Sequence, residues 1–522
     1  MFKNSKVWFI IIWIFWALLY GLSFPTYNFS FLIWFCFVPV IIFSYFESLR
    51  RVALYSFFSS FIFLILTLYW IYGFWTPAPF LMFTIYAFYY AFAFVSAAII
   101  AKKFPKLRIF AFPLSFISME ILRSVGFHGF QWNILAHSQW NNILVIQMAD
   151  LVGVHGVSFV IMLVNSIIAE IVISYFEHKN FYEVLKLNKL PLFLLFFIVI
   201  FTLSYGFFSL KKYERIIKNS SIERVALLQP NTPSRAEWWS KRWQYYATFW
   251  KLHAEAMLKE PEFIIWCETM VKNYVWYYLG RYSLDEEVNK FNIRFVKMPE
   301  EFGVPILLTS PDTYDGKKNY NTADYLEPGR NGVQRNEKIH LVPFGEWMPG
   351  YDSIPIVKKV MEIEGAGSFV PSTNFNVIQG RKSRFRVLVC YEDMFPSLAK
   401  IFIKKRVNYF INGTNDGWAY KLGFKHPMYQ HLAGAILTSV SVRRPIARAA
   451  NTGITCIIMP DGRITGDIGT YNTGFYVGNV PLIDENIETF YVKIGYLFPY
   501  LIFLFYVIIY IASIFKRGEK IE

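Results

Sequence analysis

Two different patterns of apolar residues divide the chain. Residues 1–210 contain seven mainly apolar runs, each long enough to cross a bilayer as a helix, and an eighth run lies near the C-terminus. The runs cover residues 7–22, 29–46, 52–74, 79–101, 109–125, 151–176, 191–208 and 496–515. Between residues 220 and 480, short apolar runs alternate with amphipathic or polar stretches, as in a layered α/β domain. We therefore predict seven membrane helices in 1–210, an α/β domain in 211–493, and a last membrane helix with a basic tail in 494–522.

The fifth apolar run is unusual because it contains Glu120 and Arg123. Residues three apart lie on the same face of a helix, and charges within a membrane usually face the protein interior. We therefore expect both side chains to point into the helix bundle, where they can pair with each other.

The basic residues of the connections predict the orientation of the bundle, because lysine and arginine collect on the cytoplasmic side. The short connections near 25–28, 75–78 and 127–150 carry none and are expected outside. The residues expected inside are Lys3, Lys6, Arg50, Arg51, Lys102, Lys103, Lys106, Arg108, Lys179, Lys186, Lys189, Lys516, Arg517 and Lys520. Both termini are thus expected in the cytoplasm and residues 211–493 on the outer face. The first run lacks a small-residue cleavage site and is expected to be an uncleaved anchor.

The connection between the fifth and sixth runs, Phe130 to Trp140, is rich in amides and aromatic rings. Tryptophan and histidine are suited to the headgroup region of a bilayer. The sequence favours an interfacial anchor, and direct contact with a substrate is the alternative.

Composition supports a membrane protein and makes several other classes unexpected. Apolar residues make up 55% of the chain and aromatic residues 20%, above the usual values for soluble proteins. The four cysteines show neither the spacing of a disulfide framework nor that of a metal site. Many of the basic residues behind the net charge of +15 lie beside apolar runs, so nucleic acid is not an expected partner. No Walker-type loop or HExxH motif is present, and no cofactor is expected.

Six apolar stretches in the middle of the chain predict strands. They cover residues 224–228, 263–266, 305–309, 386–389, 408–412 and 454–459, with helices expected between them, for example over 243–258 and 428–442. Polar residues follow these strands directly, namely Gln229, Asn231, Glu268, Cys390 to Glu392, Asn415, Asp416 and Trp418. Because strand ends meet at one rim in such folds, we expect a ligand site at that rim.

Cys390 ends the predicted strand 386–389 and precedes two acidic residues suited to the first turn of a helix. A thiol at the positive end of a helix dipole has a lowered pKa and is a better nucleophile. Cys390 is therefore a candidate nucleophile, although a packed core thiol is the alternative.

A nucleophilic thiol needs a base and a group that stabilises the developing oxyanion. Glu268 is the candidate base because it ends an apolar strand, where desolvation raises a carboxyl pKa. Lys338 is the candidate ammonium, acting beside the backbone N–H of Tyr391. The alternatives are a surface carboxylate for Glu268, a solvated charge for Lys338 and a capping role for Glu346.

Taken together, several strings resemble the nitrilase superfamily of carbon-nitrogen hydrolases. They are Ile265 to Glu268, Lys338 to Glu346, Cys390 to Glu392, Asn415 to Trp418, Gln430-His431, Arg444-Pro445 and Arg448 to Gly453. With seven membrane runs before this region and one after it, the chain resembles the apolipoprotein N-acyltransferase family. The resemblance implies an αββα sandwich outside the membrane. It also implies site roles for the catalytic Glu268, Lys338 and Cys390, the supporting Glu346, Glu392, Tyr391, Asn415 and Trp418, and the substrate-side Trp238.

The reaction implied by the resemblance is a ping-pong acyl transfer in the bacterial inner membrane. A phospholipid would acylate Cys390, and the α-amine of a diacylglyceryl-cysteine lipoprotein would take the acyl group from the thioester. Two alternatives stay open. A membrane-tethered carbon-nitrogen hydrolase would use the same three residues, and a scaffold or transporter would have no catalysis.

Some positions depart from the pattern of the family. Cys267 stands where proline is common, and strand alternation predicts that it points away from Glu268. Ala419 replaces an aromatic residue. The helix after Gln430-His431 lacks the usual Arg and Glu, with Ile436, Thr438 and Ser441 in that helix instead.

Three aromatic or apolar segments lie in the outer region, at 238–239, 274–278 and 351–369. The last contains the flexible sequence Gly365-Ala366-Gly367. We expect some of them to form loops that enter the lipid headgroups and cover the thiol, with ordinary core packing as the alternative.

Overall fold

The computed structural model describes residues 6–516 apart from residues 26, 74–76, 127–128, 233–237, 284–285, 331, 344, 348–352, 356–357, 360–368 and 418–423. The chain divides into two compact units. One comprises Met1–Leu210 together with Lys493–Glu522, and the other comprises Lys211–Val492. The first is helical and the second contains all the described strands.

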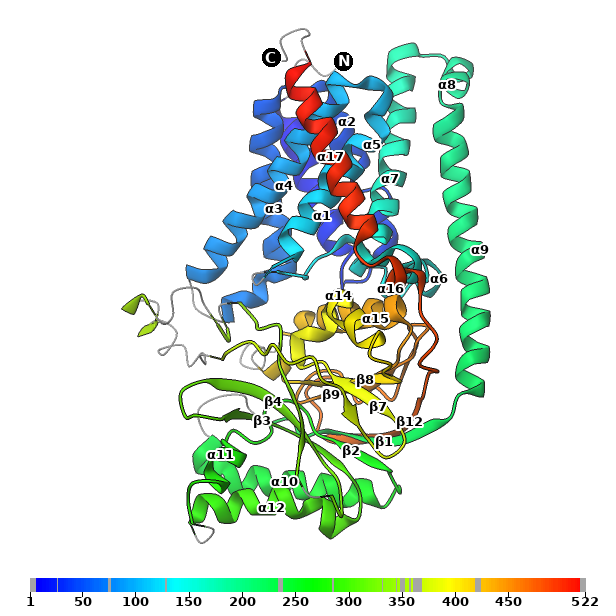
Figure 1. Ribbon diagram of the computed structural model, residues 1–522. Helices are drawn as coiled ribbons and strands as arrows, with labels where there is room; N and C mark the ends of the chain where they lie inside the picture. Colours follow the sequence, from blue (N-terminus) through cyan, green and yellow to red (C-terminus); the bar gives the residue numbers. More distant parts are fainter. Residues whose placement is uncertain are drawn as a thin grey trace. The chain divides into compact units, whose positions relative to one another are not determined.

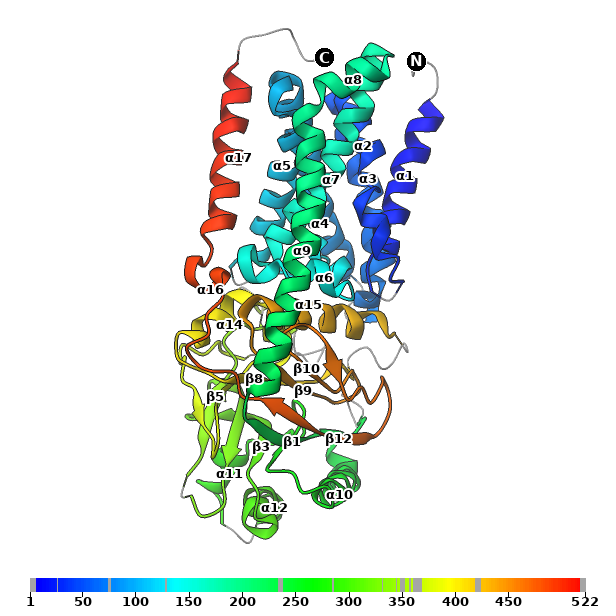
Figure 2. The same cartoon turned by 90° about the vertical axis from the view of Figure 1, so that its right-hand side faces the viewer.

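The helical unit is built from long apolar helices that run alongside one another (Figures 1 and 2). Its elements are α1 (Lys6–Leu22), η1 (Ser30–Trp34), α2 (Val38–Phe46), α3 (Leu49–Leu68), η2 (Tyr69–Gly73), α4 (Pro77–Lys103), η3 (Pro105–Leu107), α5 (Arg108–Ser124), η4 (Leu135–Gln139), α6 (Ile143–Ile146), α7 (Ala149–His178), α8 (Phe181–Leu187), the first part of α9 (Lys189–Asn219) and α17 (Leu497–Phe515). Every predicted membrane run thus contains helix.

Five helical stretches among the described residues are long and apolar enough to span a bilayer, namely 49–72, 79–103, 149–178, 189–219 and 497–515. The first two predicted runs form shorter apolar helices. The second run is interrupted because η1 ends at Trp34 and α2 begins at Val38, with Pro39 in its first turn. These helices support a membrane region, and the number of eight spans stays a prediction.

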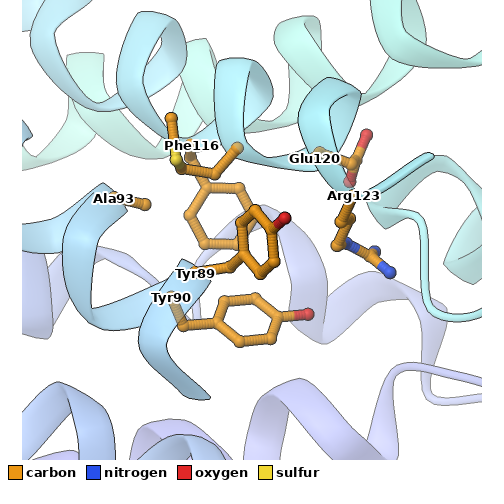
Figure 3. Close-up of a pocket in the computed structure, with 7 residues that line it drawn as sticks. Tyr89, Tyr90, Ala93, Phe116, Glu120 and Arg123 are labelled. Atoms are coloured by element: carbon orange, nitrogen blue, oxygen red, sulfur yellow. The ribbon is translucent and has the colours of Figure 1, made fainter. Parts of the chain in front are cut away.

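Glu120 and Arg123 are buried in the unit, as predicted, but their closest contacts go to the connection that follows α5. The Arg123 guanidinium donates to the carbonyl oxygens of Trp132 at 2.7 Å and Asn133 at 2.8 Å. The Glu120 carboxylate accepts from the N–H of Leu135 at 2.8 Å. The two charges also line a small pocket with Tyr89, Tyr90 and Phe116 (Figure 3). Charges on α5 therefore hold the backbone of this connection.

The connection from Phe130 to Trp140 is packed inside the unit. Residues 131–139 are buried, and the Asn133 amide donates to the Thr67 hydroxyl at 2.7 Å. The N–H of Ala136 donates to the Ser158 hydroxyl at 3.0 Å. The prediction of an interfacial anchor is therefore wrong for most of this segment, because its amides satisfy hydrogen bonds between helices. Trp140 remains partly exposed.

Several basic residues expected inside meet at one end of this unit. The Lys516 ammonium donates to the carbonyl of Lys103 at 2.6 Å, and Lys102 donates to the carbonyl of Glu47. Arg51 pairs with Glu47 at 2.9 Å. The start of α1 and the end of α17 also lie at the same end of the unit (Figure 1).

The second unit contains two six-stranded mixed sheets. The first has the order β12 (Gly474–Pro481), β1 (Ile222–Gln229), β2 (Phe263–Ile265), β3 (Ile306–Thr313), β4 (Asn319–Leu326) and β5 (Gln334–Glu337), and β1, β2 and β3 are parallel. The second has the order β11 (Ile464–Thr465), β10 (Cys456–Ile458), β9 (Ile446–Ala450), β8 (Tyr409–Thr414), β7 (Arg384–Val387) and β6 (Ile378–Gln379), and β7, β8 and β9 are parallel.

Helices cover the outer faces of the two sheets (Figure 1). The first sheet carries α10 (Trp238–Met257), α11 (Val275–Leu279) and α12 (Glu287–Phe302), and the second carries η5 (Cys390–Met394), α14 (Pro396–Ile403) and α15 (His426–Val442). The unit ends at Val492, within the short helix α16 (Phe490–Ile494). Apolar rings fill the space between the sheets, with Phe263 and Phe385 at 5.5 Å. The predicted αββα layering is thus observed.

All six predicted strands are confirmed within a few residues. Their inner positions are apolar because both faces of each central strand are covered. Six further strands, β4, β5, β6, β9, β11 and β12, were not predicted from the sequence. Polar residues predominate in β4 and β5, so periodicity alone did not identify these two strands.

Candidate active site

Glu268, Lys338 and Cys390 follow β2, β5 and β7 and lie together in the second unit. The Lys338 ammonium is 3.7 Å from Glu268 Oε1, and the Cys390 thiol is hydrogen-bonded to the Glu268 carboxylate. Each of the three residues is at most 9% exposed. The structure therefore brings together the three side chains selected from the sequence, two after strands of the first sheet and one after a strand of the second.

The Glu268 carboxylate is held by donors on both oxygens. The Asn321 amide donates to Oε1 at 2.8 Å, and the N–H of Asn415 donates to Oε2 at 3.0 Å. Burial raises the pKa of Glu268 above its ordinary value, although the Lys338 charge opposes this shift. A carboxylate with a raised pKa is a better proton acceptor, as a general base requires.

Lys338 remains charged although it is buried. Burial alone would lower the pKa of Lys338, but the carboxylates of Glu346 and Glu268 more than offset this effect and raise it. Glu346 Oε1 lies 2.8 Å from the ammonium, and its Oε2 accepts from the N–H of Val342 at 2.9 Å. Glu346 therefore orients Lys338, and the lysine is not a solvated surface charge.

Cys390 lies at a sharp elbow with a φ of +52°, in the left-handed region that is costly for a side-chain-bearing residue. The prediction of a lowered pKa is wrong. Burial raises the pKa of the Cys390 thiol well above its ordinary value, and the charge of Glu268 adds to this effect. The following turn, η5, has five residues, so its dipole is small compared with the desolvation. The resting thiol is therefore protonated, and the Glu268 carboxylate lies beside it.

Glu392 connects the segment after Lys338 to the strand before Cys390. Its Oε1 accepts from the N–H groups of Ile339 at 2.6 Å and His340 at 2.9 Å. Its Oε2 accepts from the N–H of Val389 at 2.8 Å. The buried carboxylate of Glu392 thus ties the residues that follow Lys338 to the residue that precedes Cys390.

A family model described as carbon-nitrogen hydrolase matches residues 224–484, the region that contains this site. The chain belongs to the carbon-nitrogen hydrolase family. A second model, described as the N-terminal domain of apolipoprotein N-acyltransferase, matches residues 16–167 of the helical unit. The two models match in the same order as the two parts of the chain predicted from the sequence.

Relatives align with most of the chain. The apolipoprotein N-acyltransferase of Geobacter metallireducens is 29% identical over 397 residues, which cover 75% of this chain and 71% of the relative. Apolipoprotein N-acyltransferase 1 of Treponema denticola is 25% identical over 553 aligned residues, 99% of each chain. Among solved structures, Nit3 of Saccharomyces cerevisiae, a nitrilase superfamily member, aligns with a TM-score of 0.36 and 17% identity over 50% of this chain and 92% of its own. The relatives confirm the resemblance found in the sequence.

Two residues of the site were missed by the sequence analysis. Asn321, on β4, donates to Glu268 and also to Glu346 Oε1 at 3.1 Å, so it joins the two carboxylates. The Thr414 hydroxyl, at the end of β8, lies 3.3 Å from the sulfur of Cys390. Polar residues at strand ends were the available signal for Thr414, whereas Asn321 lies in a strand that the apolar pattern did not predict.

Other predicted site residues are only partly described. Tyr391 follows Cys390, and its ring packs against Phe395 at 4.9 Å. Trp238 is the first residue of α10, but its side chain lies outside the described part, as do Trp418 and Ala419. The substrate-side role of Trp238 and the supporting role of Trp418 therefore stay predictions.

One of the predicted covering segments is packed against the domain. The Trp276 indole, in α11, donates to Asp324 Oδ2 at 2.6 Å, and Val275 is buried. For residues 274–278, these contacts support the alternative of ordinary packing within the domain over a loop that enters the lipid headgroups. The side chains at 238–239 and most of 351–369, including Gly365 to Gly367, lie outside the described residues.

Two of the departures from the family pattern lie among the described residues, at Cys267 and in α15. Cys267 is buried in the core, with its sulfur 3.1 Å from that of Met270, whereas Glu268 contacts Cys390. In α15, the Ser439 hydroxyl bridges the carbonyls of Arg444 at 2.7 Å and Met459 at 2.9 Å. At the departing positions themselves, the Ser441 hydroxyl donates to the carbonyl of Leu437 in the same helix at 2.7 Å, so it does not brace α15 against a neighbouring element.

Proposed function

We propose that this protein transfers a fatty acyl chain from a membrane phospholipid, through a thioester on Cys390, to the N-terminal amine of a diacylglyceryl-cysteine lipoprotein. The observation that carries the proposal is the buried contact among Cys390, Glu268 and Lys338 within the region matched by the carbon-nitrogen hydrolase model. The relatives named apolipoprotein N-acyltransferase, which align along most of the chain, support lipoprotein N-acylation.

In the first half-reaction, Glu268 takes the thiol proton and the sulfur attacks the ester carbonyl of the phospholipid. The carbonyl oxygen becomes an oxyanion, stabilised by the Lys338 ammonium and the N–H of Tyr391. The carbon–oxygen bond then breaks. The leaving lysophospholipid takes the proton from Glu268, and the acyl group remains on Cys390 as a thioester.

In the second half-reaction, the α-amine of the lipoprotein attacks the thioester. An α-amino group with a pKa of about 8 is partly neutral at physiological pH and is therefore nucleophilic. Glu268 takes a proton from the attacking nitrogen, the carbon–sulfur bond breaks, and the sulfur recovers the proton. The product is an amide, and the enzyme returns to its resting state.

The neighbouring residues have supporting roles in this scheme. Glu346 keeps Lys338 charged and oriented. Glu392 holds the segment after Lys338 against the strand before Cys390, so that the ammonium and the thiol stay close to each other. The N–H of Asn415 orients Glu268. The proposed roles of Trp238 and Trp418 are contacts with the lipid substrates, which aromatic rings suit.

The membrane arrangement follows from the same proposal. The helical unit would cross the bacterial inner membrane eight times, with residues 211–493 on the periplasmic face and both termini in the cytoplasm. The clustering of Arg51, Lys102, Lys103 and Lys516 at one end of the unit supports this orientation, because basic residues favour the cytoplasmic side. Both substrates are lipids, which gives the membrane helices a purpose.

The test is to incubate the detergent-solubilised protein with phospholipid labelled in its acyl chains. We expect a protein-bound label that hydroxylamine releases, as it does from thioesters. Cys390→Ala should abolish the label. Cys267→Ala is the matched control, since it removes a buried thiol beside Glu268 whose sulfur contacts Met270 instead, and it should keep the label.

A diacylglyceryl peptide should then discharge the label as an N-acyl product. Release as free fatty acid would instead favour the hydrolase. A label that persists in Cys390→Ala would refute the choice of nucleophile. Absence of any adduct on the wild-type protein would refute the transfer reaction and favour a scaffold or transporter.

A further inference from the structure

Four charged side chains form a buried cluster beside Cys390, whose carbonyl oxygen lies 3.3 Å from one of them, His431. They are Asp393, Asp416, His431 and Arg448, and each is at most 2% exposed. Arg448 pairs with Asp393 and lies 3.3 Å from Asp416 Oδ2. Two acids and two bases therefore balance in charge, and the reaction scheme above uses none of them.

Both ring nitrogens of His431 lie near acceptors, and Nδ1 also lies 3.1 Å from the Arg448 NH2 group, which is a donor. Nδ1 lies 3.1 Å from Asp416 Oδ1, and Nε2 lies 2.9 Å from Asp393 Oδ1 and 3.3 Å from the carbonyl oxygen of Cys390. A neutral imidazole has one N–H, whereas the imidazolium donates from both nitrogens. Burial alone would lower the pKa of His431, but the charges of Asp393 and Asp416 outweigh burial and Arg448 and raise it to about 9. At neutral pH, Nε2 thus presents a proton toward Cys390.

The carbonyl of Cys390 has a second donor. The Asn412 amide donates to it at 2.9 Å and to the carbonyl of Leu388 at 2.7 Å. Arg448 donates to the amide oxygen of Asn412 at 2.8 Å, which directs the NH2 group toward the elbow. His431 and Asn412 therefore hold the same carbonyl oxygen, and Arg448 touches both side chains.

This carbonyl belongs to the peptide group whose other end is the N–H of Tyr391. The peptide group is planar and trans, so its C=O and N–H point in opposite directions. A donor that fixes the Cys390 oxygen therefore also fixes the direction of the Tyr391 N–H. The positive φ of Cys390 makes this restraint more valuable, since the elbow conformation is not favoured by the residue itself.

We propose that His431 is a positioning residue that, by holding the Cys390 carbonyl, aims the Tyr391 N–H at the oxyanion formed during acyl transfer. The proposal rests on the proposed function, since it assumes an acyl intermediate on Cys390. A donor that is already aimed stabilises developing charge without reorganisation, which is the largest contribution in many acyl transfers. The competing view is that the cluster only braces α15 against η5.

Two conservative substitutions separate these views. The amide nitrogen of Asn at position 431 can replace Nδ1, which faces Asp416, whereas that of Gln can replace Nε2, which faces the Cys390 carbonyl. Both variants remove the positive charge and keep a buried amide. They differ in which neighbour receives a hydrogen bond, so each is a control for the folding cost of the other.

Two rates are measured on each variant. The first is formation of the acyl adduct from labelled phospholipid, which passes through an oxyanion. The second is alkylation of Cys390 by iodoacetamide, a displacement at carbon without an oxyanion, measured against Cys390→Ala as blank. We expect His431→Asn to slow acylation about tenfold to a hundredfold, while alkylation stays within about threefold of wild type. His431→Gln should acylate at least fivefold faster than His431→Asn.

Equal acylation rates in the two variants would overturn the proposal, as would a parallel fall of acylation and alkylation. If His431→Asn does not fold, Asn412→Asp gives the same test, because it replaces the other donor to the Cys390 carbonyl by an acceptor. It should slow acylation more than alkylation, and equal slowing would overturn the proposal.

If the wild-type protein forms the adduct on Cys390 and the variants form it at the same rate, only the positioning role of His431 is refuted. An adduct that does not need Cys390 refutes the proposed function and, with it, this role.

Discussion

Replacing Glu392 by Gln tests whether one buried carboxylate holds the site together. The carboxylate accepts three backbone hydrogen bonds, from Ile339, His340 and Val389. In Glu392→Gln, the amide oxygen can keep the bonds from Ile339 and His340. The NH2 group of Gln then faces the N–H of Val389. The charge-assisted hydrogen bond from Val389 is lost, and two donors point at each other in its place.

The expected cost follows from these contacts. A hydrogen bond to a charged group contributes about 1.5–3 kcal/mol, and a buried donor left without an acceptor adds to the loss, so we expect about 2–4 kcal/mol less free energy of unfolding. At about 2–4 °C per kcal/mol for a domain of this size, the midpoint of thermal unfolding should fall by about 4–16 °C. Because the lost bond restrains the residue before Cys390, acylation should slow about tenfold or more, even well below the midpoint.

The assay measures thermal unfolding in detergent and the rate of adduct formation from labelled phospholipid. Glu223→Gln is the matched control. Glu223 is also buried and accepts from Ser383 at 2.6 Å and Tyr409 at 2.9 Å, but it contacts no residue of the site among the described contacts. Ser383 and Tyr409 both donate to Oε2, so the amide oxygen of Gln can keep both bonds, and acylation should stay near the wild-type rate. A Glu392→Gln protein with normal unfolding and normal acylation would show that the three bonds do not restrain the site.

Three further predictions use the same assays. Thr414→Val removes the hydroxyl 3.3 Å from the Cys390 sulfur, so acylation should slow severalfold with a stability change of about 1 kcal/mol or less, and an unchanged rate would contradict this. Gly453→Ala should cost about 1–3 kcal/mol in thermal unfolding, because the new Cβ would lie 2.1 Å from Asp416 Oδ2, and an unchanged midpoint would rule out this clash. The pKa of His431 is raised from 6.5 to about 9 by folding, so its contribution, on the order of 3 kcal/mol, is complete below pH 6.5 and is lost as the pH rises through about 9. Unfolding midpoints from pH 6 to 10 should therefore fall more steeply in the wild type than in His431→Gln, and equal slopes would exclude a charged His431.

Much of the fold could be predicted because the relevant signal is local. Apolar runs of bilayer length predicted helices, and the strands β1, β2, β3, β7, β8 and β10 are buried on both faces and therefore read as apolar stretches. Strand β4 could not be found in this way. Its sequence, Asn319 to Leu326, is largely polar because several of its side chains bond to neighbouring elements and to the site, as Asp324 does with Arg335 and Asn321 with Glu268 and Glu346.

For the internal connection from Phe130 to Trp140, the sequence did give a signal, but the surroundings predicted from it were wrong. Its amides and rings suit a membrane interface, and the same groups equally satisfy hydrogen bonds between buried helices. Composition alone does not distinguish the two surroundings. The partners that decide it, Glu120, Arg123 and Ser158, lie on two other helices of the unit.

The sequence by itself determined which chemistry is available, since the motifs around Glu268, Lys338 and Cys390 carry the family resemblance and each side chain brings its own functional group. Only the tertiary structure decided the protonation states. The pKa of Cys390 is raised although its place after a strand suggested the reverse, because desolvation by distant residues exceeds the dipole of a five-residue turn. Likewise, His431 contacts the elbow from 41 residues further along the chain. Charge states inside a protein depend on solvent exclusion and on neighbours brought together by folding, and neither is encoded in local sequence.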